Sequence, residues 1–322
     1  MQITVIGCGR WGSLIAWYLD RLGHTVTLYG RAASARMQRF LETRANDLLA
    51  MPDSVRLTTS LQQACRSEVI VISIGVQALR GLVEEMRPYG VRNRTIVLCM
   101  KGLEIGTGLR PSEIASSLDA SNAVAVWLGP GHVQEYYRGI PNCMVIDSVN
   151  EALKISLVER FKSDLIRFYY GNDLLGTEIG AAAKNVMGIA AGVLDVICVP
   201  LKGPLMSRGA REVARLIKAM GGNELSAYGL AHLGDYETTL FSKYSHNRMY
   251  GEMLAKGQRF EKLAEGVATS KAMKLLGDKY GVDLPITQAV CSVCYGEGDD
   301  ERRCKEAIGA LFARSTKPEM YE

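Results

Sequence analysis

The first twelve residues restrict the fold more than any other part of the chain. The sequence QITVIGCGRWGSLIAWYL begins with a β-rich run at residues 2–6, continues with Gly7-x-Gly9-x-x-Gly12, and then becomes helical. In a βαβ unit, Gly7 permits a tight turn, Gly9 lets the backbone approach a pyrophosphate, and Gly12 allows close helix–strand packing. A glycine-rich turn without a ligand is the alternative. The flanking strand and helix favour a dinucleotide site, with the pyrophosphate at the helix N-terminus.

β-rich runs alternate with helical segments through the first half of the chain. Such alternation is typical of a parallel, doubly wound α/β sheet. From about Thr177 onward the patterns are helical. We therefore predict an N-terminal Rossmann-like domain over residues 1–176 and an all-α domain over residues 177–322. The predicted strands lie at residues 2–6, 25–29, 68–74, 94–100, 122–128 and 142–147, with a short closing strand near 165–170.

Composition limits the partners of the chain. A net charge of +4 over 322 residues is too small to indicate a nucleic acid or a membrane surface as partner. No apolar run approaches the ~20 residues of a membrane span. No signal peptide precedes the first strand, so we expect a cytoplasmic protein.

The cysteines are typical of reduced, packed thiols, because most of the eight lie inside apolar runs. The sequence CSVC at residues 291–294 has the spacing of half a zinc site, but no second pair completes it. We expect packing along a helix for this pair and no metal ion.

The end of the second predicted strand indicates which cofactor binds. The sequence LYGRAAS places Arg31 where an NAD-specific site usually presents an acidic residue to the ribose. A cation without an acidic neighbour suits the 2′-phosphate of NADP. Arg31 could instead be a solvated loop residue. We expect NADPH as the cofactor, with NADH tolerated.

Two further strand ends carry candidate ligand-binding groups. In MKGLE, Lys101 stands at the carboxyl end of a parallel strand, which is where α/β sheets bind ligands. In WLGPGHVQE, another strand ends in a turn that contains Gly129 and Gly131, whose backbone N–H groups could meet an anion. His132 fits a supporting or surface position better than that of a base.

The helical half contains one lysine in an unusually apolar segment, GAAAKNVMGIAAG at residues 180–192. A buried amine costs several kcal/mol unless it is paired or loses its proton. Either Lys184 extends to water, or its pKa is shifted for chemistry. Further along, Asp235 and Thr239 are four residues apart and would share one helix face. A polar turn follows, in which Ser245 or Asn247 could simply cap the next helix.

Taken together, these segments resemble the NAD(P)-dependent sn-glycerol-3-phosphate dehydrogenases of the bacterial type, nearly end to end. GCGRWG resembles the family's GxGxWG, MKGLE its SKG segment, GPGHVQE its GPSHAxE turn, and AAAKNVMGIAAG its catalytic ALKN-type helix. LGDYETT…SHNRMYG resembles its GDLxxT…SRNRxxG stretch, and EGVATSKA its EGxxT segment. The resemblance implies hydride transfer between dihydroxyacetone phosphate and sn-glycerol 3-phosphate, a place in glycerophospholipid metabolism, and a homodimer.

The resemblance also implies roles for individual residues. Lys184 would be the catalytic acid and base, Lys101 and Asp235 would contact the substrate, and Thr239 would support the site. Burial and the charge of Lys101 would lower the pKa of Lys184, and Asp235 would oppose that shift. The remaining implied contacts are, for the cofactor, Gly7, Gly9, Arg10, Trp11, Gly12, Arg31, Lys101, Val133 and Glu265, and, for the phosphorylated substrate, Gly129, Gly131, Ser245, His246, Asn247 and Arg248.

Two residues depart from the family pattern. His246 stands where the family has the arginine of SRNR, and Gly131 stands where it has the serine of GPSHA. The loss of one charge-assisted bond to a phosphate costs ~1.5–3 kcal/mol, and Arg248 could compensate for it. A related dehydrogenase that acts on a different small keto or polyol substrate is therefore an alternative. A cofactor sensor without catalysis is disfavoured, because it would have no need of Lys184 and Asp235.

Overall fold

A computed structural model describes residues 1–319 of the chain. Its N-terminal half forms one eight-stranded sheet with the order β3-β2-β1-β4-β5-β6-β7-β8. This order begins as in dinucleotide-binding folds, and the predicted Rossmann-like domain is confirmed. The strands are β1 Gln2–Ile6, β2 Thr25–Tyr29, β3 Arg56–Thr58, β4 Val69–Ile72, β5 Thr95–Leu98, β6 Ala123–Leu128, β7 Asn142–Asp147 and β8 Ile166–Tyr170.

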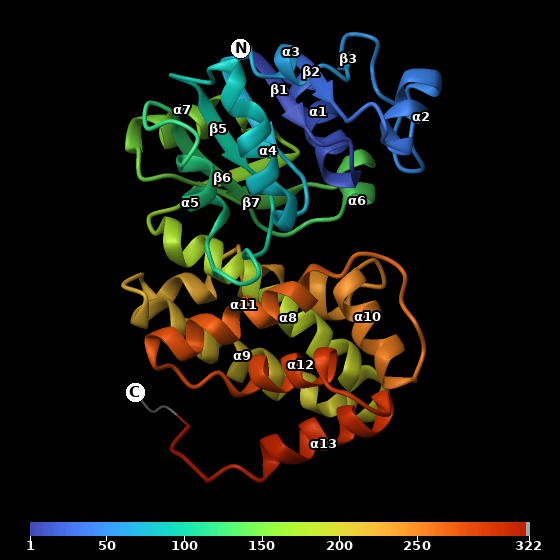
Figure 1. Cartoon of the computed structure of the whole chain (residues 1–322), viewed down its shortest axis with the longest axis vertical. Helices are drawn as coiled ribbons and strands as arrows, with labels where there is room; N and C mark the ends of the chain where they lie inside the picture. Colours follow the sequence, from blue (N-terminus) through green and yellow to red (C-terminus); the bar gives the residue numbers. More distant parts are fainter. Residues whose placement is uncertain (320–322) are drawn as a thin grey trace.

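The predicted parallel sheet has one exception, because β7 runs antiparallel to β6. The connection between these strands does not cross the sheet. Its short helix α6 (Val133–Tyr137) stays beside α1 (Arg10–Arg21), where the ring of Tyr136 packs 5.8 Å from that of Trp11. The chain therefore re-enters the sheet from the edge it left, which gives an antiparallel pair (Figure 1). β3 was not predicted, because three residues carry too little pattern.

Helices cover both faces of the sheet. Alternate strand residues point to opposite faces, so Val69 and Val71 of β4 pack in one core cluster and Ile70 and Ile72 in another. Besides α1 and α6, the helices of this half are α2 Ala35–Thr43, α3 Leu61–Ala64, α4 Leu79–Met86, α5 Pro111–Ser116 and α7 Glu151–Phe161.

The second half is helical, as predicted, and no strand follows β8 in the described residues. The long helix α8 runs through its centre and contacts α9, α10, α11 and α12 (Figure 1). Residues 320–322, which the predicted domain includes, lie outside the described part. The helices are α8 Leu174–Ile197, α9 Lys202–Ala219, α10 His246–Ala255, α11 Glu265–Tyr280, α12 Pro285–Tyr295 and α13 Asp300–Phe312.

The small residues of α8 allow other backbones to approach it closely. A Cβ on Gly192 would lie 1.9 Å from the carbonyl oxygen of Arg248, and one on Gly251 would lie 2.1 Å from that of Ile189. The α8–α10 crossing therefore depends on glycine from both helices. This crossing brings the beginning of α10 against the middle of α8, where Lys184 lies.

By length and hydropathy alone, α8 could cross a membrane, with a mean hydropathy of 1.3. The expectation that no apolar run approaches that length is therefore corrected. Of the apolar stretch, 83% is buried inside the protein, as expected for the central helix of a helical domain.

All eight cysteines are free thiols. Cys291 and Cys294 lie one turn apart on α12, the helical arrangement that their spacing predicts. Within residues 1–319, no three His, Cys, Asp or Glu side chains lie close enough together to hold a metal ion.

Candidate active site

The glycine turn after β1 forms the floor of a cleft at the carboxyl edge of the sheet. Gly7 has φ +116°, and a Cβ on it would lie 2.2 Å from the carbonyl oxygen of Ser73. A Cβ on Gly12 would lie 1.9 Å from the carbonyl oxygen of Gly7. Both positions therefore need glycine for the packing of the protein itself. Around Gly9, in contrast, the nearest atom is Nη1 of Arg36 at 3.8 Å, which leaves space for a ligand.

This turn opens into a cleft of about 1300 Å³ between the sheet and the helical domain. Three buried side-chain atoms around it lack a hydrogen-bond partner: Nε1 of Trp11, Nε2 of His132 and Oε1 of Gln134. Buried polar groups without partners are costly, so they suit a polar ligand such as a dinucleotide. The predicted residues that line the cleft are Gly7, Gly9, Arg10, Trp11, Arg31, Lys101, Gly131, Val133, His246, Asn247 and Glu265.

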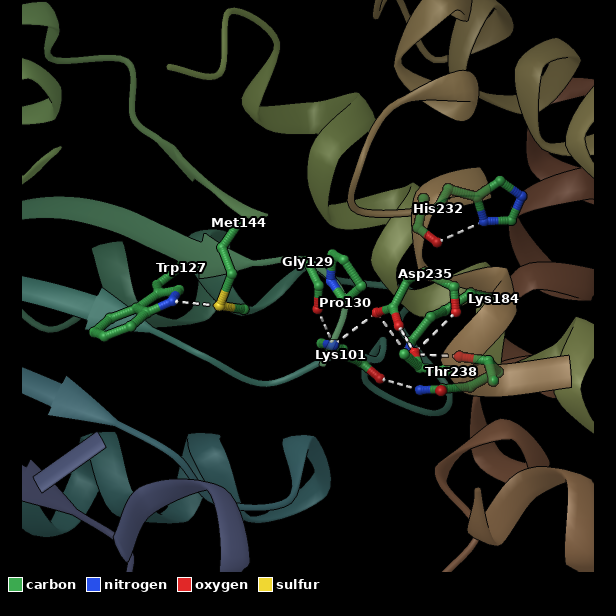
Figure 2. A network of polar contacts seen from close by, with 12 residues as sticks. Lys101, Trp127, Gly129, Pro130, Met144, Lys184, His232, Asp235 and Thr238 are labelled. Carbon is green, nitrogen blue, oxygen red and sulfur yellow. Dashed lines mark hydrogen bonds and ion pairs between the residues drawn. The ribbon is translucent and has the colours of Figure 1, made fainter. Parts of the chain in front are cut away.

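Lys101, which lines the cleft, belongs to a compact charged network. Figure 2 shows this network. Lys184 Nζ lies 2.6 Å from Asp235 Oδ2 and donates to Thr239 Oγ1 at 2.8 Å. Lys101 Nζ lies 2.7 Å from the same Asp235 oxygen and donates to the carbonyl oxygen of Gly129 at 2.6 Å. The side chain of Lys184 is 8% exposed and that of Asp235 is 1% exposed. The lysine therefore does not extend to water, and its ammonium is paired inside the protein.

The network shifts the pKa values of its members. Burial lowers the pKa of Lys184, and Lys101 adds to this while Asp235 opposes it, so that the pKa falls from 10.5 to about 7. For Asp235, burial acts to raise the pKa, but Lys101 and Lys184 hold it below its usual value. An amine with a pKa near 7 can both donate and accept a proton near neutral pH.

A chain of amide groups joins this network to the cleft. Asn185, which lines the cleft, donates from Nδ2 to the carbonyl oxygen of Lys101 at 2.6 Å. Asn247 donates from Nδ2 to Asn185 Oδ1 at 2.9 Å and accepts from the backbone N–H of Gly266 at 2.9 Å. Asn247 is thus more than a helix cap, because it ties α8, α10 and α11 together next to Lys184.

Asp235 and Thr239 do converge on one point, but not on the α-helix that their spacing predicts. Asp235 ends a short 3₁₀ turn, and Thr239 lies in the π-helical segment Glu237–Phe241. Sequence reasoning also missed two supporting residues. Thr238 donates a hydrogen bond to Asp235 Oδ1, and its i,i+3 spacing from Asp235 was the available signal. The ring of His232 contacts the carbonyl oxygen of Gly180 at 2.8 Å, and burial lowers its pKa to about 4.

Two predicted substrate contacts are occupied within the protein. Ser245 caps α10 by accepting from the backbone N–H of Arg248 at 3.3 Å, which is the alternative that its position left open. The guanidinium of Arg248 lies 2.5 Å from Asp195 and donates to the carbonyl oxygen of Ser242 at 3.0 Å. Arg248 therefore points away from the cleft and does not replace the family arginine.

Two loops that line the cleft differ in how tightly their predicted contact residues are packed: the Arg31 loop and the Gly131 loop. Arg31 pairs with Glu85 at 2.8 Å, and both side chains are largely exposed. Gly131 has φ +136°, and a Cβ on it would lie 2.2 Å from the ring of Tyr136. A serine at 131 is therefore incompatible with this packing.

Arg36, which lines the cleft beside Gly9, is a further candidate that sequence reasoning missed.

Comparisons with known proteins agree with this geometry. Residues 2–154 match the family model of the NAD-dependent glycerol-3-phosphate dehydrogenase N-terminus, and residues 173–304 match that of its C-terminus. The chain belongs to the glycerol-3-phosphate dehydrogenase family. An NAD(P)+ glycerol-3-phosphate dehydrogenase of Thermoanaerobacter sp. is 33% identical over 334 residues, covering 100% of this chain and 99% of that protein. One of Chlorobium limicola is 34% identical over 344 residues, covering 100% of both.

The fold agrees as well. The crystal structure of a glycerol-3-phosphate dehydrogenase from Coxiella burnetii superposes with a TM-score of 0.88, at 24% identity, over 97% of this chain and 99% of that one. As a member of the glycerol-3-phosphate dehydrogenase family, the chain is an NAD(P)-dependent oxidoreductase.

Proposed function

We propose that the chain interconverts dihydroxyacetone phosphate and sn-glycerol 3-phosphate, with Lys184 as the proton donor and acceptor. The observation that carries the proposal is the position of this amine. It is paired with Asp235 at 2.6 Å, has a pKa lowered to about 7, and lies next to a cleft that begins at a dinucleotide-type glycine turn.

The residues of the chain account for the proton in this reaction. A bound nicotinamide cofactor supplies the hydride that reaches C2 of the ketone. As the C2–oxygen double bond opens, the oxygen takes a proton from the Lys184 ammonium, which becomes a neutral amine. In the oxidative direction the amine takes that proton back from the C2 hydroxyl. The small exposed part of Lys184 gives the oxygen access, and burial excludes water from the charges.

Asp235 and Lys101 hold the reacting amine in place. Asp235 stabilises the ammonium form and fixes Nζ together with Thr239, while Lys101 offsets the charge of the carboxylate. When Lys184 becomes neutral, Asp235 keeps one cationic partner and is not left as an unpaired buried charge. The site can therefore change its proton count without losing its structure.

The finer features of the proposal rest on the residues that face the cofactor and on the family. We propose NADPH as the preferred cofactor because Arg31, and no acidic residue, follows β2.

A cytoplasmic homodimer that serves glycerophospholipid metabolism is the setting that the family resemblance suggests. Size-exclusion chromatography with light scattering tests the oligomeric state.

The activity is tested with the purified chain by following NADPH oxidation with dihydroxyacetone phosphate and identifying the product by NMR. The expected result is stoichiometric formation of sn-glycerol 3-phosphate. A panel of other small ketones, phosphorylated and not, runs in parallel. If another ketone were reduced with a much higher kcat/KM, the chain would be a related dehydrogenase with a different substrate. If no ketone were reduced although NADPH bound, the proposed function would be wrong.

A further inference from the structure

Arg10 is a cation that meets no carboxylate in the cleft. It follows Gly9 at the start of α1, and its Nη1 lies 3.4 Å from Nε2 of His246, the first residue of α10. This contact joins the two domains across the cleft. Within the described residues, no carboxylate lies within ion-pair distance of Arg10: Asp47, which lines the same cleft, pairs with Arg39 instead. A guanidinium without a carboxylate partner is free to pair with an anion such as a phosphate.

His246 fixes the direction of that guanidinium. Its Nδ1 lies 3.3 Å from the carbonyl oxygen of Leu263, which accepts only if Nδ1 carries the proton. Nε2 is then an acceptor and receives the N–H of Arg10. This assignment agrees with the pKa of His246: burial and the charges of Arg10 and Lys262 lower it, and the hydrogen bond to Leu263 only partly opposes them. The neutral ring therefore orients Arg10 and is not itself the charge that binds.

A chain of neighbouring residues leads from this guanidinium toward Lys184. His246 is followed by Asn247, whose amide binds Asn185, the neighbour of Lys184 in α8. The N-terminus of α10, a ten-residue helix, adds its positive end at the same place. The other arginine at this helix, Arg248, is held by Asp195 and turned away.

On the basis of the proposed function, we propose that Arg10 binds the phosphate group of the substrate, and that this contact replaces the cofactor contact that the family resemblance implies for it. The family's arginine at position 246 of α10 is a histidine here. Arg10, in the glycine turn of the other domain, binds the phosphate in its place, and His246 holds the guanidinium of Arg10 in position. The same turn approaches the cofactor pyrophosphate, so the test must separate the phosphate of the substrate from that of the cofactor.

The first test is Arg10→Ala. KM for dihydroxyacetone phosphate should rise by tenfold to a hundredfold, the usual loss for one charge-assisted bond. The kcat/KM for unphosphorylated dihydroxyacetone and the Kd for NADPH should stay within about twofold of the wild type, because neither depends on a substrate phosphate. If instead NADPH binding weakened and both ketones lost kcat/KM equally, Arg10 would bind the cofactor, and the proposal would be overturned.

The second test restores the charge at its other position. In the double variant Arg10→Ala with His246→Arg, KM for dihydroxyacetone phosphate should return to within a few-fold of the wild type, because one guanidinium again reaches the same place. The contrary result is a double variant that still reduces dihydroxyacetone at the wild-type rate while its KM for dihydroxyacetone phosphate stays high. That result would contradict the claim that guanidinium groups at positions 10 and 246 reach the same phosphate. Arg92→Ala is the matched control, since Arg92 is 73% exposed and pairs with Asp119 away from the cleft; it should change nothing.

A binding measurement keeps this inference separate from the proposed activity. Calorimetry of inorganic phosphate with the NADPH-loaded protein should show binding that Arg10→Ala weakens by at least tenfold. If the wild type bound phosphate in this way but did not reduce dihydroxyacetone phosphate, the proposed function would be wrong and the phosphate site would stand. Equal phosphate binding by the wild type and Arg10→Ala would overturn the site itself.

Discussion

Lys101 and Lys184 contact the same oxygen atom, Oδ2 of Asp235, at 2.7 and 2.6 Å. One carboxylate thus holds two ammonium groups that come from different domains, one from the segment that follows β5 and one from the middle of α8. Burial and the nearby charge of Lys101 both disfavour the ammonium form of Lys184. Burial is the main reason why the pKa of Lys184 falls to about 7; Lys101 lowers it further, and Asp235 opposes the shift.

The first prediction concerns the dependence of the rate on pH. Ketone reduction needs the ammonium form of Lys184, so kcat/KM should fall as the pH rises through about 7. Oxidation of sn-glycerol 3-phosphate needs the neutral amine, so kcat/KM should rise through the same range. Both profiles are measured from about pH 6.5 upward, because the phosphate of the substrate titrates near 6.

Lys101→Met provides the control for this assignment. Without the second cation, Asp235 stabilises the Lys184 ammonium alone, so both profiles should move to higher pH. A profile that stayed at its wild-type position, or that had the same sign in both directions, would contradict the role of Lys184.

The second prediction concerns cofactor choice. The Arg31–Glu85 pair is largely exposed, with side-chain exposures of 60% and 47%, and such pairs contribute only ~0–1 kcal/mol. Arg31 can therefore leave Glu85 for a 2′-phosphate at little cost. We expect kcat/KM to favour NADPH over NADH, Arg31→Ala to reduce that preference about tenfold, and Glu85→Gln to increase it slightly. A wild type that prefers NADH would contradict this, as would an unchanged ratio in Arg31→Ala.

The third prediction concerns the α8–α10 crossing. In Gly192→Ala the added methyl would lie 1.9 Å from a backbone carbonyl oxygen, so the helices must move apart. We expect a loss of about 1–3 kcal/mol in the free energy of unfolding, together with a lower kcat, because the crossing positions Asn247 beside Asn185.

Gly81→Ala is the matched control for this variant. Gly81 also lies in a helix, α4, but a Cβ there meets nothing within 4 Å. It should gain about 0.5–1 kcal/mol from the lower backbone entropy of the unfolded chain. Urea denaturation of both variants measures the difference. Equal stabilities would show that the crossing tolerates a side chain.

Most of the fold was predictable because its signals are local. The glycine turn, the β-rich runs and the apolar α8 each identify an element from a few adjacent residues. The direction of β7 was not predictable in this way, because it depends on α6 packing beside α1 and not crossing the sheet. The three residues of β3 were too few to give a pattern.

The site was predictable in its residues but not in their contacts. Lys184 could be identified because it is the only amine in an apolar helical segment. Asp235 and Thr239 could be identified because a spacing of four residues places two side chains on one helix face. The link between Arg10 and His246 could not be inferred, because these residues are 236 positions apart and on different domains. The ion pair between Arg248 and Asp195 likewise follows only from tertiary packing.

The most direct measurement for this account is the turnover of Lys184→Met with NADPH and dihydroxyacetone phosphate. Methionine preserves the shape of the side chain, and Asp235 keeps Lys101 as its partner, so the fold and the Kd for NADPH should be preserved. Lys154→Met, which removes a lysine buried outside the cleft, controls for the loss of a buried amine. We predict that kcat falls by on the order of 10² or more in Lys184→Met and stays near the wild-type value in Lys154→Met. A folded Lys184→Met protein that binds NADPH and turns over at a near-normal rate would contradict the account.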